Sequence, residues 1–133
     1  MKPMSKDYSG LFPNTSGGKK ANNAHKMTGK TVSLSIGTYD TGIKVLKQNE
    51  HIPGTKEFKP GKSEIHISIT ELQDLVNLKA GTGTIIPKTT KEKVDFGKII
   101  GNWIDFATGE SIPTTKGMII YSIGGTHVVP TRP

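Results

Sequence analysis

The chain has 133 residues, a formal charge of +7, a mean hydropathy of -0.38 and 32% hydrophobic residues. This length suits one domain with one modest core, and no apolar run is long enough to cross a bilayer, so we expect no membrane anchor. The absence of cysteine excludes disulfides, thiol nucleophiles and thiolate zinc sites.

Lysine supplies almost all of the positive charge, because Arg132 is the only arginine. A basic surface favours polyanions such as nucleic acid or anionic membrane. Arginine is the usual reader of guanine, so a nucleic-acid partner would be held through phosphate more than through base edges. Lysines that merely keep the surface soluble explain the same charge nearly as well.

Residues 1–29 follow neither a helical nor a strand period and are rich in Gly, Asn, Ser and Lys. This predicts a basic flexible segment ahead of one domain over residues 30–133. Apolar and polar residues alternate over residues 31–36, which predicts a half-buried strand with residues 43–46 as its partner. A polar loop over residues 47–63 follows.

Residues 64–69 alternate again and predict another strand. A helical period follows, with Thr70 as the expected cap and Gly81 as the stop. Further strands are expected after residue 84 and over residues 98–106, 117–123 and 126–130. The sequence therefore predicts an α+β fold, mainly an antiparallel sheet with one or a few helices packed on it.

Gly124 and Gly125 separate the last two apolar runs, which predicts a two-residue hairpin turn at those positions. In that register Ser122 lies opposite His127, and both side chains project from one side of the sheet. Such a pair is more often a satisfied hydrogen bond than a catalytic unit. A G-x-S-x-G elbow for acyl transfer is also absent.

His51 lies in the polar loop among lysine and hydroxyl side chains. Two histidines from distant parts of the chain suit acid–base cleavage of a phosphodiester, because imidazole exists in both protonation states near neutrality. A lysine would stabilise charge on the phosphoryl oxygens. The histidines lack metal-ligand spacing and have no carboxylate cluster beside them, so we expect neither a metal nor another cofactor.

Several stretches of the sequence resemble a known family. The clearest is TTKGMIIYSIGGTHVVP (114–130). The others are KQNEHIPGT (47–55), the serine of PGKS (60–63), AGTGT (80–84) and VDFGKIIG (94–101). Residues 46–133 are thereby similar to the bacterial polymorphic toxin type 50 domain. That domain is found at the C-terminus of polymorphic toxins and in phage head-morphogenesis proteins. It is a predicted ribonuclease of the barnase/EndoU/colicin/RelE-like fold.

The resemblance implies an antiparallel sheet that holds the active site, preceded by helices. The residues themselves predict an arm and strands at the start of the chain in place of those helices. The recurring polar positions of the family fall on His51, Thr55, Ser63, Thr115, Lys116, Tyr121, Ser122, Thr126 and His127.

We expect His51 and His127 to act as acid and base, in unassigned order, and Lys116 to stabilise the phosphoryl group. Thr115, Tyr121 and Ser122 would orient these groups or the substrate. The substrate-binding residues are expected to be Lys47, Thr55, Lys62, Ser63 and Thr126.

Together these expectations describe a metal-independent endoribonuclease toxin domain that cuts RNA by 2′-hydroxyl attack and leaves a 2′,3′-cyclic phosphate. It would act as a monomer in the target-cell cytoplasm, after secretion or delivery as part of a larger protein. Its producer would need an immunity protein, acidic to match this surface. The alternative is a non-catalytic basic β-rich module that binds nucleic acid or protein in phage assembly.

Overall fold

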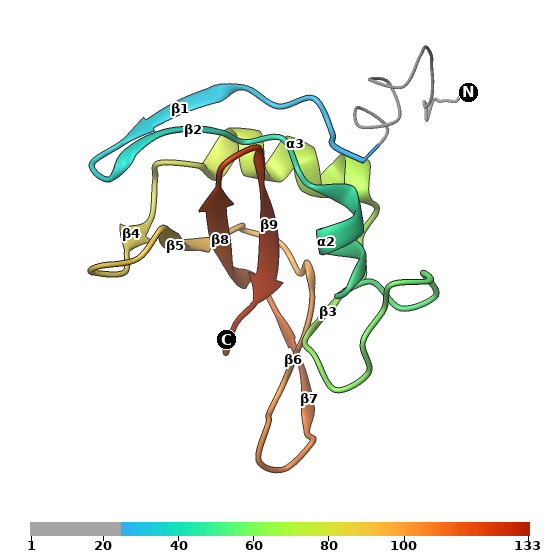
Figure 1. Ribbon diagram of the computed structural model, residues 1–133. Coiled ribbons are helices and arrows are strands. Elements are labelled where there is room, and N and C mark those ends of the chain that lie inside the picture. The colour runs from blue at the N-terminus through green and yellow to red at the C-terminus, as the bar shows by residue number, and fades with distance from the viewer. Residues whose placement is uncertain (1–24) are drawn as a thin grey trace.

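A computed structural model describes residues 25–133 and contains two helices and nine strands over that range (Figure 1). The helices are α2 (Val45–Asn49) and α3 (Ile69–Lys79). The strands are β1 (Thr31–Leu34), β2 (Gly37–Asp40), β3 (Glu64–Ile65), β4 (Thr84–Ile85), β5 (Lys91–Asp95), β6 (Gly101–Ile104), β7 (Ser111–Thr114), β8 (Lys116–Ser122) and β9 (Gly125–Pro130). Every pair of neighbouring strands is antiparallel, so the predicted α+β class is confirmed.

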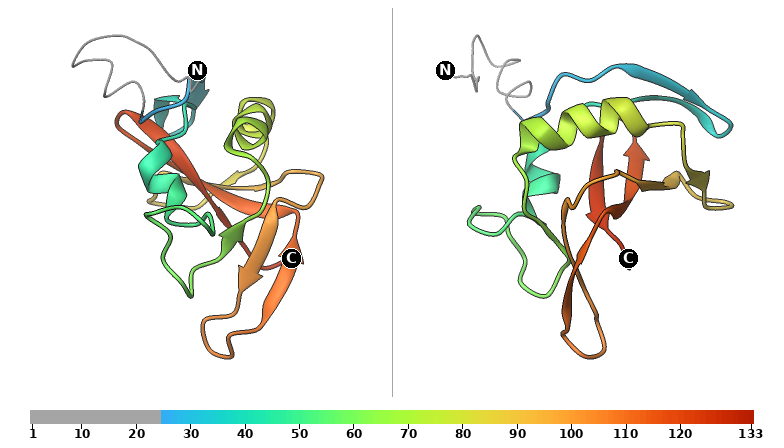
Figure 2. Two further views of the ribbon diagram at one scale, coloured as in Figure 1. Left: turned by 90° about the vertical axis from the view of Figure 1, so that its right-hand side faces the viewer. Right: turned by 180° about the vertical axis from the view of Figure 1, so that it is seen from behind.

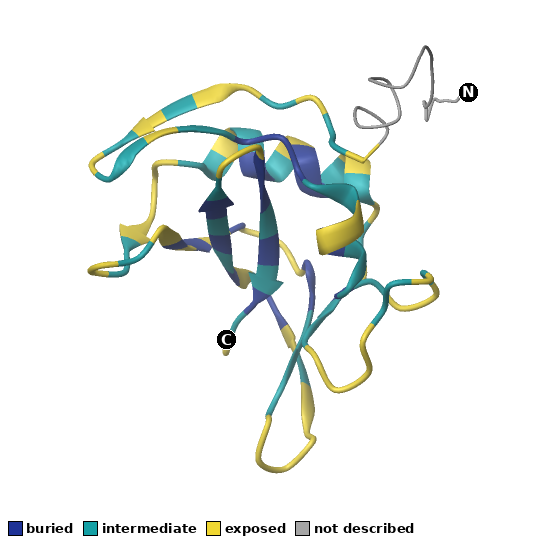
Figure 3. Ribbon diagram, viewed as in Figure 1, coloured by how far each residue is buried: buried dark blue, intermediate teal, exposed yellow. Residues whose placement is uncertain are grey.

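The largest sheet has the strand order β4-β5-β8-β9. Alternate residues of β8 are buried, and they point to the face that α3 covers, where Ile119 and Val128 meet Leu72 and Val76 in the core. Figures 1 and 2 agree that α3 lies on only one side of β8 and β9. Figure 3 shows the resulting alternation of buried and half-buried positions along both strands.

Two smaller sheets complete the fold. β1 and β2 form a hairpin that lies along α3 (Figure 2), and β3, β6 and β7 form the second small sheet. Gly101 in β6 allows β3 to approach closely, because a Cβ atom there would lie 1.8 Å from the carbonyl oxygen of Glu64.

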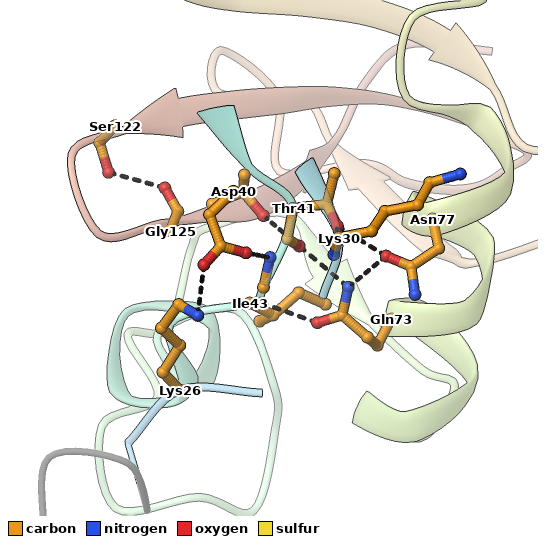
Figure 4. Close-up of polar contacts among 11 residues, drawn as sticks. Lys26, Lys30, Asp40, Thr41, Ile43, Gln73, Asn77, Ser122 and Gly125 are labelled. Atoms are coloured by element: carbon orange, nitrogen blue, oxygen red, sulfur yellow. Dashed lines mark hydrogen bonds and ion pairs between the residues drawn. The ribbon is translucent and has the colours of Figure 1, made fainter. Parts of the chain in front are cut away.

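Buried polar side chains tie residues 40–43 to α3 (Figure 4). The Gln73 amide accepts a hydrogen bond from the backbone N–H of Ile43 at 2.8 Å and donates one to the carbonyl oxygen of Thr41 at 2.9 Å. The Thr41 hydroxyl donates to Asn77 Oδ1 at 2.6 Å. Because each of these buried groups has a partner, the segment that leads into α2 is held firmly on the core.

The structure corrects the strand pairing predicted for residues 31–46. Strand β1 pairs with β2, not with residues 43–46, and Val45 begins a helix. Ile43 forms one parallel bridge with Thr126 before that helix starts, which explains its strand-like apolar pattern. Strand β7 was not predicted, since its Pro113 argues against a strand in any position except a sheet edge, which is where β7 lies.

The predicted helix is confirmed with a different cap. Helix α3 begins one residue before Thr70, and its N-cap is Ser68, whose hydroxyl accepts a hydrogen bond from the Glu71 N–H at 3.1 Å. The strand predicted over residues 64–69 is correspondingly cut short to β3.

Most of the predicted N-terminal arm, residues 1–24, lies outside the described residues. Its last residues contact the domain, because Lys26 forms a bridge with Lys44 and the Met27 N–H donates to the carbonyl oxygen of Ile43 at 2.8 Å. Within residues 25–133, neither helix is long and apolar enough to cross a membrane.

Candidate active site

His51 and His127 lie side by side. Their ring centroids are 6.1 Å apart and the ring planes differ by 22°. His51 directly follows the C-cap of α2, and His127 lies in the middle of β9. The two imidazoles are 76 positions apart in the chain, so it is the docking of α2 against β9 that brings them together.

Gln48 makes that docking specific. Its side-chain amide, fully buried, donates to the carbonyl oxygen of Val128 at 2.9 Å and accepts from the Val128 N–H at 2.7 Å. The amide thus satisfies both backbone groups of the residue that follows His127. His51 is three positions after Gln48, so this double hydrogen bond sets the spacing between the rings.

The backbone around His51 is held from two sides. Its N–H donates to the carbonyl oxygen of Gln48 at 2.9 Å, and its carbonyl oxygen accepts from the Ile65 N–H at 2.8 Å. Nδ1 of the ring lies 2.9 Å from the carbonyl oxygen of Ser63. A carbonyl only accepts, so Nδ1 carries a hydrogen, and Nε2 of the neutral ring has the free lone pair.

Both rings resist protonation. Burial is the main cause of the lowered pKa of His51, against the opposing effect of the Ser63 hydrogen bond. Burial first, and then the charge of the facing His51, lower the pKa of His127 to about 4. His51 is only 5% exposed, whereas His127 is half-buried, so an incoming molecule meets His127 first.

Charged side chains surround the pair. Lys47, Lys59 and Lys62 place their ammonium groups 3.6, 3.7 and 4.0 Å from one carboxylate oxygen of Glu50. Burial would raise the pKa of Glu50, but the three lysines hold it below its ordinary value. Three cations around a single carboxylate leave a net positive charge beside His51, which suits an anionic ligand.

A hollow of about 630 Å³ lies next to this cluster, with Lys44, Lys47 and Glu50 in its wall. Neither imidazole lines it, so we do not place the reacting group there.

Ser122 is not the cross-strand partner of His127, so the predicted register is wrong. Ser122 pairs with Gly125, so Ile123 and Gly124 form the turn, and Ile120 is the partner of His127. The Ser122 hydroxyl donates to the Gly125 carbonyl oxygen at 2.9 Å and lies 3.3 Å from Lys44 Nζ. The shift is two residues, so the prediction that Ser122 and His127 share one face of the sheet still holds.

Tyr121 and Thr126 face the opposite side of the sheet from His127. The Tyr121 hydroxyl donates to the buried carboxylate of Glu92 at 2.7 Å, and burial together with this bond raises the tyrosine pKa. The Thr126 hydroxyl lies 3.2 Å from the carbonyl oxygen of Thr41 and is fully buried. The alternation of side chains along a strand separates both residues from the histidine pair.

Three other predicted residues lie away from the reacting rings. Lys116 is four positions along β8 from Ile120, about 13 Å at the usual rise of a strand. Thr115 precedes Lys116, and its side chain hydrogen-bonds Asp95, whose pKa is lowered first by the Gly97 N–H and then by this bond. The Thr55 hydroxyl lies 2.8 Å from the carbonyl oxygens of both Asn49 and Ile52, and its one hydrogen stabilises the turn after α2.

Ser63 makes one hydrogen bond through its backbone and another through its side chain. Its carbonyl orients His51, while its hydroxyl accepts from the Ile104 N–H at 3.0 Å. Lys47 and Lys62 do lie close enough to the rings to lower the pKa of His51.

Four residues near the pair were not predicted as site residues, and they are Lys44, Gln48, Glu50 and Lys59. Gln48 and Glu50 flank the histidine loop, but nothing in their spacing signals a role before α2 is recognised as a helix. Within residues 25–133 no group of three histidine or acidic side chains is placed to hold a metal ion.

The site is a pair of imidazoles with lowered pKa values beside a lysine cluster. His127 lies on the face of the large sheet that α3 does not cover. No curated protein compared with the chain matches it. The family model of bacterial toxin 50 matches residues 43–130, a range that contains both histidines and the lysine cluster beside them. This chain therefore belongs to the bacterial toxin 50 family.

Proposed function

We propose that this toxin domain is a metal-independent endoribonuclease that cuts RNA by attack of a 2′-hydroxyl and leaves a 2′,3′-cyclic phosphate. The observation that carries the proposal is the distance of 6.1 Å between the rings of His51 and His127. Two imidazoles at this separation can address the two oxygens that exchange protons around one phosphorus atom.

The roles of the two histidines follow from their surroundings. His127 has the lower pKa and is the more exposed ring, so it is unprotonated near neutrality and acts as the base. His51 donates Nδ1–H to the Ser63 carbonyl, which favours its cation, so it holds the proton of the pair and acts as the acid. The negative charge of bound RNA raises the pKa of both rings and so promotes uptake of that proton.

The proton balance closes within the pair. His127 takes the proton of the 2′-hydroxyl as the 2′-oxygen bonds to phosphorus, and the bond from phosphorus to the 5′-oxygen breaks. Nε2 of His51 gives its proton to that leaving oxygen, since Nδ1 is occupied by Ser63. Exchange with water then returns the proton from His127 to His51.

In this proposal the lysine cluster stabilises the negative charge on the phosphoryl oxygens. Lys47 and Lys62 lie 3.6 and 4.0 Å from the carboxylate of Glu50, the residue before His51, which supports a role for them in stabilising a phosphoryl oxygen beside the pair. We assign this role to Lys47 and Lys62 in place of Lys116, which lies farther along β8.

The test is incubation of the purified protein with total RNA in EDTA. The parent should cut RNA, and His51→Ala and His127→Ala should each lower the rate by at least about a hundredfold, the usual contribution of general acid–base catalysis. His66→Ala is the matched control, because His66 is exposed and pairs with Glu64 outside the site. Circular dichroism checks that each variant is folded.

A second substrate tests the chemistry. An RNA with 2′-O-methyl groups lacks the nucleophile, so it should stay intact while the unmodified RNA is cut. The products of the unmodified RNA should end in a cyclic phosphate, which mass spectrometry distinguishes from a linear phosphate by the mass of one water.

Cleavage that survives both alanine substitutions, or cleavage of the 2′-O-methyl strand, contradicts this mechanism. If RNA binds without being cut, the domain is the non-catalytic nucleic-acid module that its basic charge also suits. An acidic neutralising protein and a monomeric state stay predictions.

A further inference from the structure

One face of the large sheet is unlike the other. On β8 the residues Met118 and Ile120 are half-buried, while their neighbours Ile119 and Tyr121 on the other face are buried in the core. Helix α3 covers only the buried face (Figures 1 and 2). His127 lies on this half-buried face, because it is the cross-strand partner of Ile120.

The pairing of β5, β8 and β9 places the residues of this face in rows that run across the three strands. Lys91 pairs with Ile120, and Ile120 pairs with His127. In the next row Lys93 pairs with Met118, and Met118 pairs with Val129. Directly paired residues of an antiparallel sheet point the same way, so an apolar strip on β8 and β9 adjoins His127 and has exposed lysines along its β5 side.

We infer that this face, with the strip Met118, Ile120 and Val129 and the flanking Lys91 and Lys93, binds the part of a single-stranded RNA that extends from the histidine pair. The inference rests on the proposed function and names where its substrate lies. Apolar side chains at the centre match the apolar faces of unstacked bases, and lysines at the side match the phosphates.

Charge complementarity and continuity favour RNA as the occupant. The strip begins at His127, so a strand whose phosphate reacts there continues onto it without leaving the surface. Lys116 lies on the same face two rows beyond Ile120, but directly opposite Asp95, which offsets part of its charge at the far end of the strip. Double-stranded RNA keeps its bases stacked and inaccessible to the strip, so a single strand fits better.

The experiment measures binding without cleavage. A short fluorescein-labelled 2′-O-methyl oligoribonucleotide of mixed sequence is titrated with protein, and fluorescence anisotropy is followed at several salt concentrations. The double variant Lys91→Gln/Lys93→Gln should bind roughly tenfold more weakly at low salt, with a slope of log affinity against log salt that is smaller by about one to two.

The matched control removes the same charge elsewhere. Lys30→Gln/Lys98→Gln neutralises two exposed lysines outside this face, since Lys30 precedes β1 and Lys98 pairs with Glu71 at the start of α3. This control should bind as the parent does. Ile120→Thr should weaken binding without changing the salt slope, because it removes apolar contact and no charge.

The inference is overturned if the two double variants weaken binding equally, if Lys91→Gln/Lys93→Gln binds like the parent, or if no oligonucleotide binds. These outcomes are separate from failure of the proposed function. A protein that binds RNA through this face but never cuts it loses the mechanism and keeps the binding face. A protein that cuts RNA while Lys91→Gln/Lys93→Gln binds normally keeps the mechanism and loses the face.

Discussion

Nδ1 of His51 lies 2.9 Å from the carbonyl oxygen of Ser63, so the backbone decides which nitrogen of this ring exchanges protons. We expect nitrogen-15 NMR at neutral pH to show His51 with hydrogen on Nδ1. His66 provides the contrast, because its Nε2 lies 2.8 Å from Glu64 Oε1 and must carry a hydrogen to donate. A His51 ring with hydrogen only on Nε2 would contradict the assigned acid.

The rate of RNA cleavage should be highest on the acid side of neutrality. The base His127 is lost as pH falls through about 4, and the acid His51 loses its proton as pH rises past a pKa below 6.5. A plot of kcat/KM against pH reports these values for the free protein and should be bell-shaped. A rate that keeps rising through pH 8 argues against His51 as the acid.

Stability should also depend on pH, with a defined sign. The unfolded chain binds a proton at each histidine near pH 6.5, whereas folded His127 does so only near pH 4. The unfolded state therefore binds more protons in this window, and the free energy of unfolding falls as pH drops from about 6.5 to about 4, by roughly 2–3 kcal/mol for this ring.

Urea denaturation at a series of pH values measures this effect. His127→Gln should flatten the dependence between pH 6.5 and 4. Equal acid sensitivity of the parent and His127→Gln would show that the pKa of His127 is not lowered by folding.

Tyr121→Phe separates packing from catalysis. The change removes the hydroxyl that donates to buried Glu92, which also accepts from the N–H groups of Gly81 and Gly83. We expect a loss of about 1–3 kcal/mol in the free energy of unfolding, with cleavage by the folded protein unchanged. A large drop in kcat without a loss of stability would return Tyr121 to the active site.

Gln48→Ala should disturb the histidine pair from a distance. It leaves the buried N–H and carbonyl of Val128 without partners, which costs roughly 2–4 kcal/mol. In the folded fraction, wider ring spacing should weaken the mutual effect of the imidazoles and raise the pKa of His127 in an NMR titration. An unchanged titration in a destabilised protein would limit Gln48 to a structural role.

The fold class could be predicted from the sequence, since alternation along β8 and β9 and the helical period of α3 are local signals. The closeness of His51 to His127 was a hypothesis about chemistry, because the helix that brings the rings together was not predicted. The face of Ser122 was predictable and its partner was not. A turn at Ile123 and Gly124 needs a positive φ only at Gly124. Gly125 instead begins β9, where a Cβ atom would lie 2.7 Å from the carbonyl oxygen of Gly42. Helix α2 was hidden because its five residues are too few to show a period, and its N-cap Lys44 has no side-chain cap. Gln48 and Glu50 acquire their roles only after α2 docks, so no local pattern could have indicated them.

The contacts that set the spacing of the rings have a second effect at the outer side of β9. The backbone of Thr126 bonds to Gly42 and Lys44, that of Val128 bonds to Gln48, and the next outward position is Pro130, which has no N–H. The strand that carries the base thus offers no unpaired row to another copy, which guards the folded domain against edge-to-edge aggregation.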